Sequence, residues 1–123
     1  MENYPEIATE RFDNANFHIR YCLSFIKKYI RGNILEIGAG CGSFTRNYMD
    51  KTNEEIVLTE LDKKNIIDLQ NNFKDNSNIK IVNGLIDQVE KKFDIILYSH
   101  VLEHIKEDLA EIEKAKKKLK EGG

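Results

Sequence analysis

Hydrophobic positions along the chain fall into two alternating patterns. Short, nearly continuous apolar runs, typical of strands buried on both faces, occupy residues 34–37, 56–60, 79–82 and 93–98. Stretches with helical spacing occupy 19–30, 63–73 and 109–119, and residues 43–49 contain no helix breaker. Strands that alternate with helices predict a parallel sheet joined by right-handed crossovers. We therefore expect an α/β fold.

Each helical stretch presents one apolar stripe, which we expect to pack against the sheet. The stripes are Ile19, Leu23, Ile26 and Ile30 in the first stretch, Ile66, Leu69 and Phe73 in the second, and Leu109, Ile112, Ala115 and Leu119 in the last. Gly32 follows the first stretch, where a left-handed C-terminal cap is expected. The last stretch begins with acids and ends with lysines, as the helix dipole favours.

Length and composition indicate one globular unit. The 123 residues are 41% hydrophobic and 33% charged, with a single proline, and they contain no internal repeat or low-complexity linker. We divide them into an N-terminal arm and helix, 1–31, and a Rossmann-like domain, 32–123.

The charge balance excludes several classes of partner. Nineteen basic and 21 acidic side chains give a formal charge of −2, so no strong field attracts nucleic acid or a membrane surface. The apolar runs are far shorter than the roughly 20 residues that span a bilayer. With two cysteines and no signal-peptide pattern, the sequence predicts a cytoplasmic protein that binds neither nucleic acid nor membrane.

A glycine-rich turn links the strand at 34–37 to the helical stretch at 43–49. Gly38, Gly40 and Gly42 allow a ligand to approach the backbone and leave amide groups free at a helix start. Ser43 stands where the dinucleotide fingerprint needs its third glycine, which disfavours a nicotinamide cofactor, and the lysine of a P-loop is absent. A tight structural turn is the alternative interpretation.

An acidic residue after the second strand supports a nucleoside ligand. Glu60 lies 22 positions after Gly38, near the offset of about 20 at which an acidic side chain meets ribose hydroxyls in Rossmann-type sites. Asp62 is the competing candidate, and either could be an exposed acid at a strand end. We favour Glu60.

The order of these features resembles a known family. The segment ILEIGAGCGSFT at residues 34–45, Glu60, and the later stretch FDIILYSHVLEHI at 93–105 together resemble the class I S-adenosylmethionine-dependent methyltransferases. This resemblance implies a Rossmann-like three-layer sandwich with a mostly parallel sheet of strand order 3-2-1-4, truncated here before the fifth strand. It also implies S-adenosylmethionine as the cofactor and S-adenosylhomocysteine as the product.

The resemblance assigns parts of the cofactor to individual positions. Glu36 and the loop would hold its methionine part, Glu60 its ribose, and the segment at 84–87 its adenine. The expected binding residues are Glu36, Gly38, Ala39, Gly40, Gly42, Glu60, Leu61, Leu85, Ile86 and Ser99. Leu85 stands where many relatives have an acid, so we expect backbone groups or Asp87 to contact the adenine.

Two histidines follow the fourth strand, where open α/β sheets place ligands. His100 or His104 could act as the general base toward an acceptor hydroxyl, although histidines in such connections often only bond backbone carbonyls. Their spacing of four suits two metal ligands, but no third ligand has recognisable spacing, so we assign no metal.

Three functional hypotheses remain open. The first is a methyltransferase acting on a small-molecule or sugar-like acceptor. The second is a truncated cofactor-binding or interaction module without turnover of its own, and the third, disfavoured by Ser43, is half of an NAD-dependent oxidoreductase. An open edge on the fourth strand would expose unpaired backbone groups, so we also predict a homodimer or a partner chain at this edge.

Overall fold

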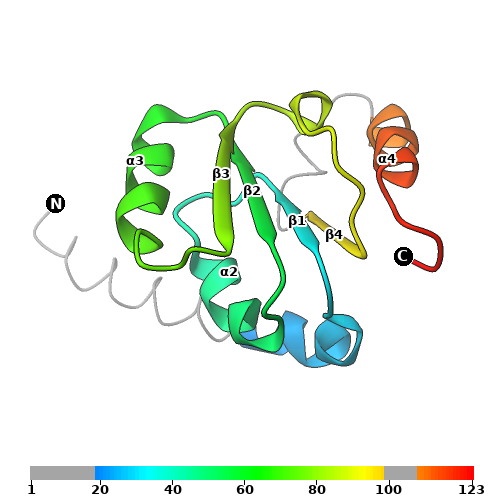
Figure 1. Cartoon of the computed structure of the whole chain (residues 1–123), viewed down its shortest axis with the longest axis horizontal. Coiled ribbons are helices and arrows are strands. Elements are labelled where there is room, and N and C mark those ends of the chain that lie inside the picture. The colour runs from blue at the N-terminus through cyan, green and yellow to red at the C-terminus, as the bar shows by residue number, and fades with distance from the viewer. Residues whose placement is uncertain (1–18, 99–107) are drawn as a thin grey trace, which may run out of the picture.

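The computed structural model describes residues 19–98 and 108–123 (Figure 1). Its sheet contains the strands β1 (Ile34–Ile37), β2 (Ile56–Glu60), β3 (Ile79–Asn83) and β4 (Ile95–Tyr98). The strands are parallel and lie in the order β3-β2-β1-β4. The predicted α/β fold and strand order are therefore confirmed.

Helices connect the strands and cover both faces of the sheet (Figure 1). Residues 19–26 are helical and continue into the 3-10 turn η1 (Lys27–Tyr29). The other helical elements are α2 (Ser43–Tyr48), η2 (Met49–Lys51), α3 (Lys63–Asn72), η3 (Ile86–Gln88) and α4 (Asp108–Lys117).

The sheet divides the core into two clusters because alternate side chains of a strand point to opposite faces. Ile34 of β1 joins the cluster beneath α2, α3 and the first helical segment. Leu35 and Ile37 join the opposite cluster, which includes Phe93 and Ala115 of α4. The result is the expected three-layer sandwich.

The first two apolar stripes pack as expected. Ile19, Leu23 and Ile30 are buried with Ile26 packed beside them, and Ile66, Leu69 and Phe73 are buried under α3. The first helix ends at Tyr29 with Ile30 as its C-cap, so the prediction that Gly32 caps it is wrong. Gly32 does have a positive φ of 67°, and its side-chain position is occupied by Asp94, whose carboxylate would lie 2.2 Å from an added Cβ.

The last apolar stripe was predicted incorrectly. Of its four residues only Ala115 is buried, whereas Leu109 is 77% and Ile112 40% exposed. Leu119 lies beyond the end of α4 and forms a parallel bridge with Phe93. Within the described residues the sheet ends at β4, so no further strand offers a surface to Leu109.

Candidate functional site

The glycine turn lies at the carboxyl end of β1 and leads directly into α2. Gly38, Gly40 and Gly42 have φ values of 69°, 62° and 94°, a region that residues with a Cβ rarely adopt. Gly42 occupies the N-cap of α2. The sequence therefore needs glycine at all three positions to make this turn.

Two of the glycines face different surroundings. A Cβ at Gly40 would meet nothing within 4 Å, whereas a Cβ at Gly42 would lie 2.4 Å from the ring of Phe73 and 3.2 Å from Leu69. Gly42 is thus required for packing against α3. Gly40 borders open space, as a residue does when a ligand must approach its backbone.

The neighbouring strand fixes the start of the loop. The Ala39 N–H donates to the carbonyl of Thr59 at 3.0 Å, and the Gly38 N–H donates to the hydroxyl of Thr59 at 3.3 Å. On the far side, the Asn72 side chain donates to the Cys41 carbonyl at 3.0 Å. The loop is therefore held between β2 and α3.

Glu60 at the end of β2 reaches the centre of the loop. Its carboxylate accepts from the Gly40 N–H at 2.9 Å and from the N–H groups of Leu61 and Asp62 at 3.1 and 2.9 Å. A carboxylate offers about four lone-pair sites, so three backbone donors leave room for a further hydroxyl. Asp62 instead forms the N-cap of α3, a structural role that accounts for this acid.

Glu36 lies inside the protein rather than on the surface of the loop. It is 0% exposed, and its carboxylate accepts from the hydroxyls of Thr45 at 2.8 Å and Tyr48 at 2.7 Å. Burial, together with the nearby Glu36 charge, raises the pKa of the Tyr48 phenol well above its ordinary value. Tyr48 therefore remains a hydrogen-bond donor, and the carboxylate is positioned beneath α2.

The residues expected to bind the cofactor beyond the ends of β2 and β3 separate into two groups. Leu61 and Leu85 are 59% and 51% exposed at the ends of β2 and β3, whereas Ile86 is fully buried. The side chain of Ile86 belongs to the core, so only its backbone is left for a ligand. Asp87 forms a 3.1 Å ion pair with Lys114 of α4.

The carboxyl end of β4 carries a phenol that the sequence pattern did not single out. Tyr98 donates to Glu111 of α4 at 2.9 Å, and burial raises its pKa above the ordinary range. The predicted residues Ser99, His100 and His104 follow it but lie outside the described residues. Their assigned roles stay predictions.

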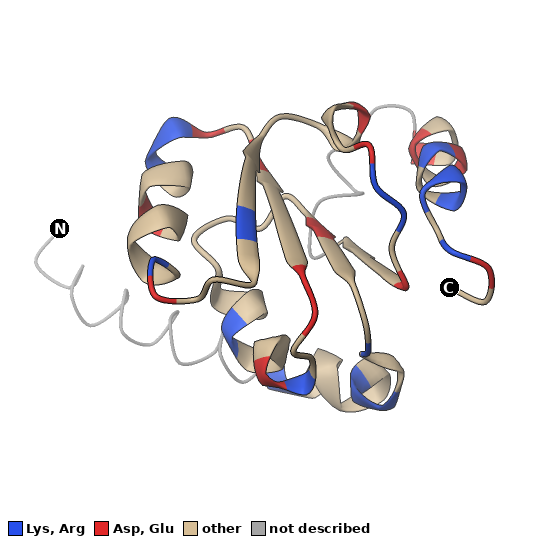
Figure 2. Cartoon of the chain, in the orientation of Figure 1, with Lys and Arg blue, Asp and Glu red and all other residues tan. Residues whose placement is uncertain are grey.

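The described residues contain neither a metal-binding cluster nor a membrane-spanning helix. Among the described residues, no group of three or more His, Cys, Asp or Glu side chains is placed to hold a metal ion. No helix in residues 19–98 and 108–123 is long and apolar enough to cross a membrane. Figure 2 shows the positions of basic and acidic residues interspersed along the helices and loops.

Sequence reasoning missed several residues that hold the site together. Thr59, Thr45, Tyr48 and Asn72 each bond to the loop or to Glu36. The sequence feature that points to the threonines and the tyrosine is a hydroxyl group within an apolar stretch, because a buried polar group needs a hydrogen-bond partner. The partner itself could not be identified without the fold.

A parallel α/β sheet with a ligand-accessible glycine turn at its carboxyl edge and an acid on the next strand defines a Rossmann-like cofactor-binding domain. A family model described as a methyltransferase domain matches residues 35–123. The chain belongs to this family, and the expected class I S-adenosylmethionine-dependent methyltransferase relationship is confirmed. No curated protein sequence matches the chain significantly.

Solved structures share the fold at low sequence identity. A DhpI complex with SAH gives a TM-score of 0.76 at 20% identity, covering 99% of this chain and 59% of that one. The glycopeptide N-methyltransferase MtfA with sinefungin gives 0.70 at 19%, covering 88% and 47%. Magnesium protoporphyrin IX methyltransferase (ChlM) from Synechocystis PCC 6803 with bound SAM gives 0.70 at 14%, covering 85% and 54%. The chain thus spans about half the length of these proteins.

The described residues fit the cofactor of this class. Gly40 leaves open space beside its backbone, the Glu60 carboxylate lies next to it, and Leu61 and Leu85 expose apolar surface at the same edge of the sheet. These features suit, respectively, the methionine part of the cofactor, a ribose hydroxyl and the adenine ring. Glu36, whose carboxylate is buried, would help to hold the methionine part of the cofactor from beneath the loop.

Proposed function

We propose that the chain binds S-adenosylmethionine at the turn from Gly38 to Gly42 and transfers its methyl group to a small-molecule or sugar-like acceptor. The observation that carries the proposal is the meeting of the Gly40 amide and the Glu60 carboxylate at 2.9 Å, beside open space at Gly40. Membership of the methyltransferase-domain family supports the same reaction class.

The cofactor supplies an electrophilic methyl group on a sulfonium sulfur. Glu60 and the turn from Gly38 to Gly42 would hold the cofactor, and the predicted general base, His100 or His104, would take the proton of an acceptor hydroxyl. The protein has to bind and align the reactants, and positioning of this kind can lower a barrier by about 7 to 11 kcal/mol. Glu60 and the open space beside the Gly40 backbone would provide the cofactor's share of that alignment.

Net charge and the variety of the matched structures bear on the acceptor class. The matched structures include a glycopeptide N-methyltransferase and a porphyrin methyltransferase, so acceptors differ widely within the fold. The near-neutral charge of −2 disfavours a nucleic-acid acceptor. A small organic acceptor fits these observations, with His100 or His104 as the predicted general base.

Titration calorimetry with S-adenosylhomocysteine tests the cofactor site. We expect Glu60→Gln to weaken binding at least about tenfold, since one hydrogen bond to a charged group contributes about 1.5 to 3 kcal/mol. Asp62→Asn is the matched control, because asparagine caps a helix as well as aspartate does and its binding should stay unchanged. Absence of binding to the wild-type chain, or a larger loss in Asp62→Asn, would overturn the assignment.

A cofactor-binding module without turnover is the second candidate. The observation that favours it is coverage, since the chain spans 47% to 59% of the three methyltransferase-fold structures described above. Methyl transfer to a panel of hydroxyl and amine acceptors separates the two candidates. S-adenosylhomocysteine formation that depends on the acceptor supports the enzyme, and tight binding without any product supports the module.

A further inference from the structure

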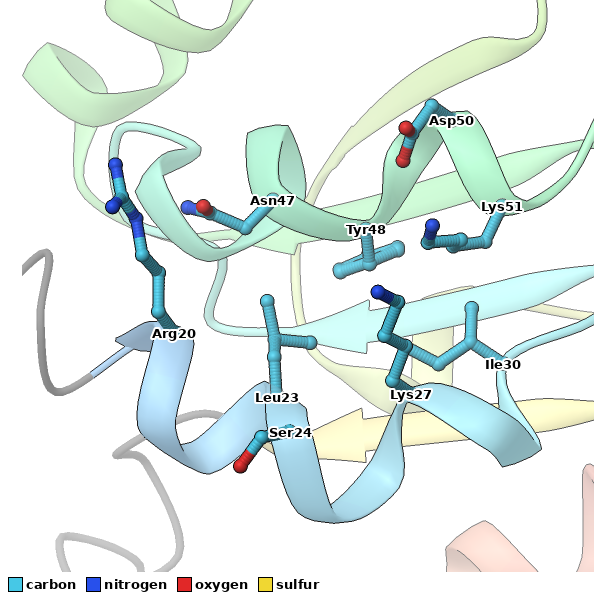
Figure 3. Close-up of a pocket in the computed structure, with 9 residues that line it drawn as sticks. All are labelled: Arg20, Leu23, Ser24, Lys27, Ile30, Asn47, Tyr48, Asp50 and Lys51. Carbon is cyan, nitrogen blue, oxygen red and sulfur yellow. The ribbon is translucent and has the colours of Figure 1, made fainter.

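A cavity lies on the face of the sheet that α2 and the first helical segment cover, and no residue of the glycine turn lines it. It has a volume of about 240 Å³ and opens between the first helical segment and the end of α2 with η2 (Figure 3). Its lining residues are Arg20, Leu23, Ser24, Lys27, Ile30, Asn47, Tyr48, Asp50 and Lys51. No residue of the turn from Gly38 to Gly42 contributes to it, so it is separate from the cofactor site.

Three cationic side chains surround this cavity. Figure 3 shows the ammonium ends of Lys27 and Lys51 turned toward each other across Tyr48, with Arg20 at the other end. None of the three takes part in an ion pair within 4.0 Å in the described part of the chain, and neither does Asp50, the single acid of the lining. The cavity therefore carries a surplus of two positive charges, three cations less one carboxylate.

The base of the cavity is apolar. Leu23 and Ile30 are 7% exposed, and Tyr48 is fully buried with its hydroxyl committed to Glu36. Lysines on a flat solvated face interact weakly with anions, because water screens them. A concave apolar base excludes part of that water, so an anion held here would interact more strongly with the surrounding cations.

We propose that this cavity binds a phosphate monoester with a small organic group. A phosphate monoester carries about −1.5 to −2 charges at neutral pH, which matches the surplus of two. Its oxygens would lie between Lys27 and Lys51, and its organic group would cover Leu23 and Ile30. The volume of about 240 Å³ lies just below the range of about 300 to 1,000 Å³ typical of small-molecule sites, which suits a ligand of this small size.

Neutral polar groups at the rim complete the environment without competing for the anion. The Asn47 side-chain amide donates to the Ser43 carbonyl at 2.7 Å, and the Ser24 hydroxyl donates to the Tyr21 carbonyl at 2.5 Å. Both groups are thus held by their own helices. Recognition depends on the three cations, and Lys27 and Lys51 are the central pair.

The test is an amide NMR titration of the full chain with phenyl phosphate, at about 0.15 M ionic strength so that loose surface binding is screened. We expect saturable shifts at Ser24, Asn47 and Lys51, with affinity at least about tenfold higher than for benzoate, which has one charge. Inorganic phosphate should bind at the same signals but more weakly, because it leaves the apolar base uncovered.

Charge-neutral variants locate the site. Lys27→Gln and Lys51→Gln should each weaken phenyl phosphate binding about tenfold, the loss expected for one charge-assisted hydrogen bond. Lys74→Gln, which removes the same charge from an exposed lysine outside the cavity, should leave it unchanged. Non-saturating shifts, equal effects of all three variants, or shifts centred on Gly40 would overturn the proposal. Cofactor binding is read separately at Gly40 and Glu60.

Discussion

Replacing the loop glycines one at a time separates a ligand-facing position from a packing position. Gly40 and Gly42 both have positive φ values, 62° and 94°, so alanine strains the backbone at either site. Only at Gly42 would the new Cβ collide, because the Phe73 ring would lie 2.4 Å away. The two alanine variants should therefore behave differently.

The structure sets the size of that difference. Left-handed backbone strain costs about 1 to 2 kcal/mol in each variant. Phe73 is 4% exposed, so its ring cannot turn into solvent, and overpacking adds about 1 to 3 kcal/mol for Gly42→Ala. We expect a loss of about 1 to 2 kcal/mol for Gly40→Ala and about 2 to 5 kcal/mol for Gly42→Ala.

Urea unfolding measures the stability of both variants, and calorimetry with S-adenosylhomocysteine measures their binding. Gly40→Ala should unfold at a urea midpoint between those of the wild type and Gly42→Ala, but bind at least tenfold more weakly, because its Cβ enters the space that the ligand approaches. Folded Gly42→Ala should retain most of its affinity. Equal stabilities would refute the Phe73 contact, and undiminished binding by Gly40→Ala would refute the ligand-facing role.

The remaining predictions concern the core, acid stability and the sheet edge. Tyr48→Phe removes the phenol donor to buried Glu36 and should lower the free energy of unfolding by about 1 to 3 kcal/mol, measured in urea. A hydrogen bond from the Asn33 N–H, with smaller contributions from Lys120 and Arg31, lowers the pKa of Asp94 from its ordinary value of 3.8. The ionised Asp94 should therefore stabilise the folded protein above pH 3.8, and this contribution should vanish as the pH falls through the pKa of the folded state. The free energy of unfolding of Asp94→Asn should depend less steeply on pH in acid. β4 ends the described sheet, so we expect sedimentation to show a dimer or a partner-bound chain, whereas a clean monomer would contradict pairing at this edge.

The sequence predicted the strands well because continuous apolar runs reflect burial on both faces. The predicted bounds of β1 and β2 are those observed, β3 extends by one residue to Asn83, and β4 begins at Ile95, two residues later than predicted. The prediction that the apolar stripe of α4 packs against the sheet was wrong. Whether Leu109 is buried depends on a neighbouring layer, and hydrophobic spacing along one helix contains no information about that layer.

The site was predicted only where it depends on local patterns along the chain. Glycine spacing and the offset of Glu60 are local patterns, and the structure places Gly40 beside that carboxylate. The burial of Glu36 against Tyr48, twelve positions later, depends on how α2 folds back over β1. No pattern along the chain indicates which hydroxyl a buried carboxylate will meet.

The most direct test of cofactor binding is the stability of the wild-type chain with S-adenosylhomocysteine or with NAD. A ligand that binds only the folded state at 100 times its dissociation constant adds about 2.7 kcal/mol. We predict a rise in unfolding temperature with S-adenosylhomocysteine that Glu60→Gln diminishes, and no rise with NAD. Stabilisation by NAD, or none by S-adenosylhomocysteine, would contradict the account.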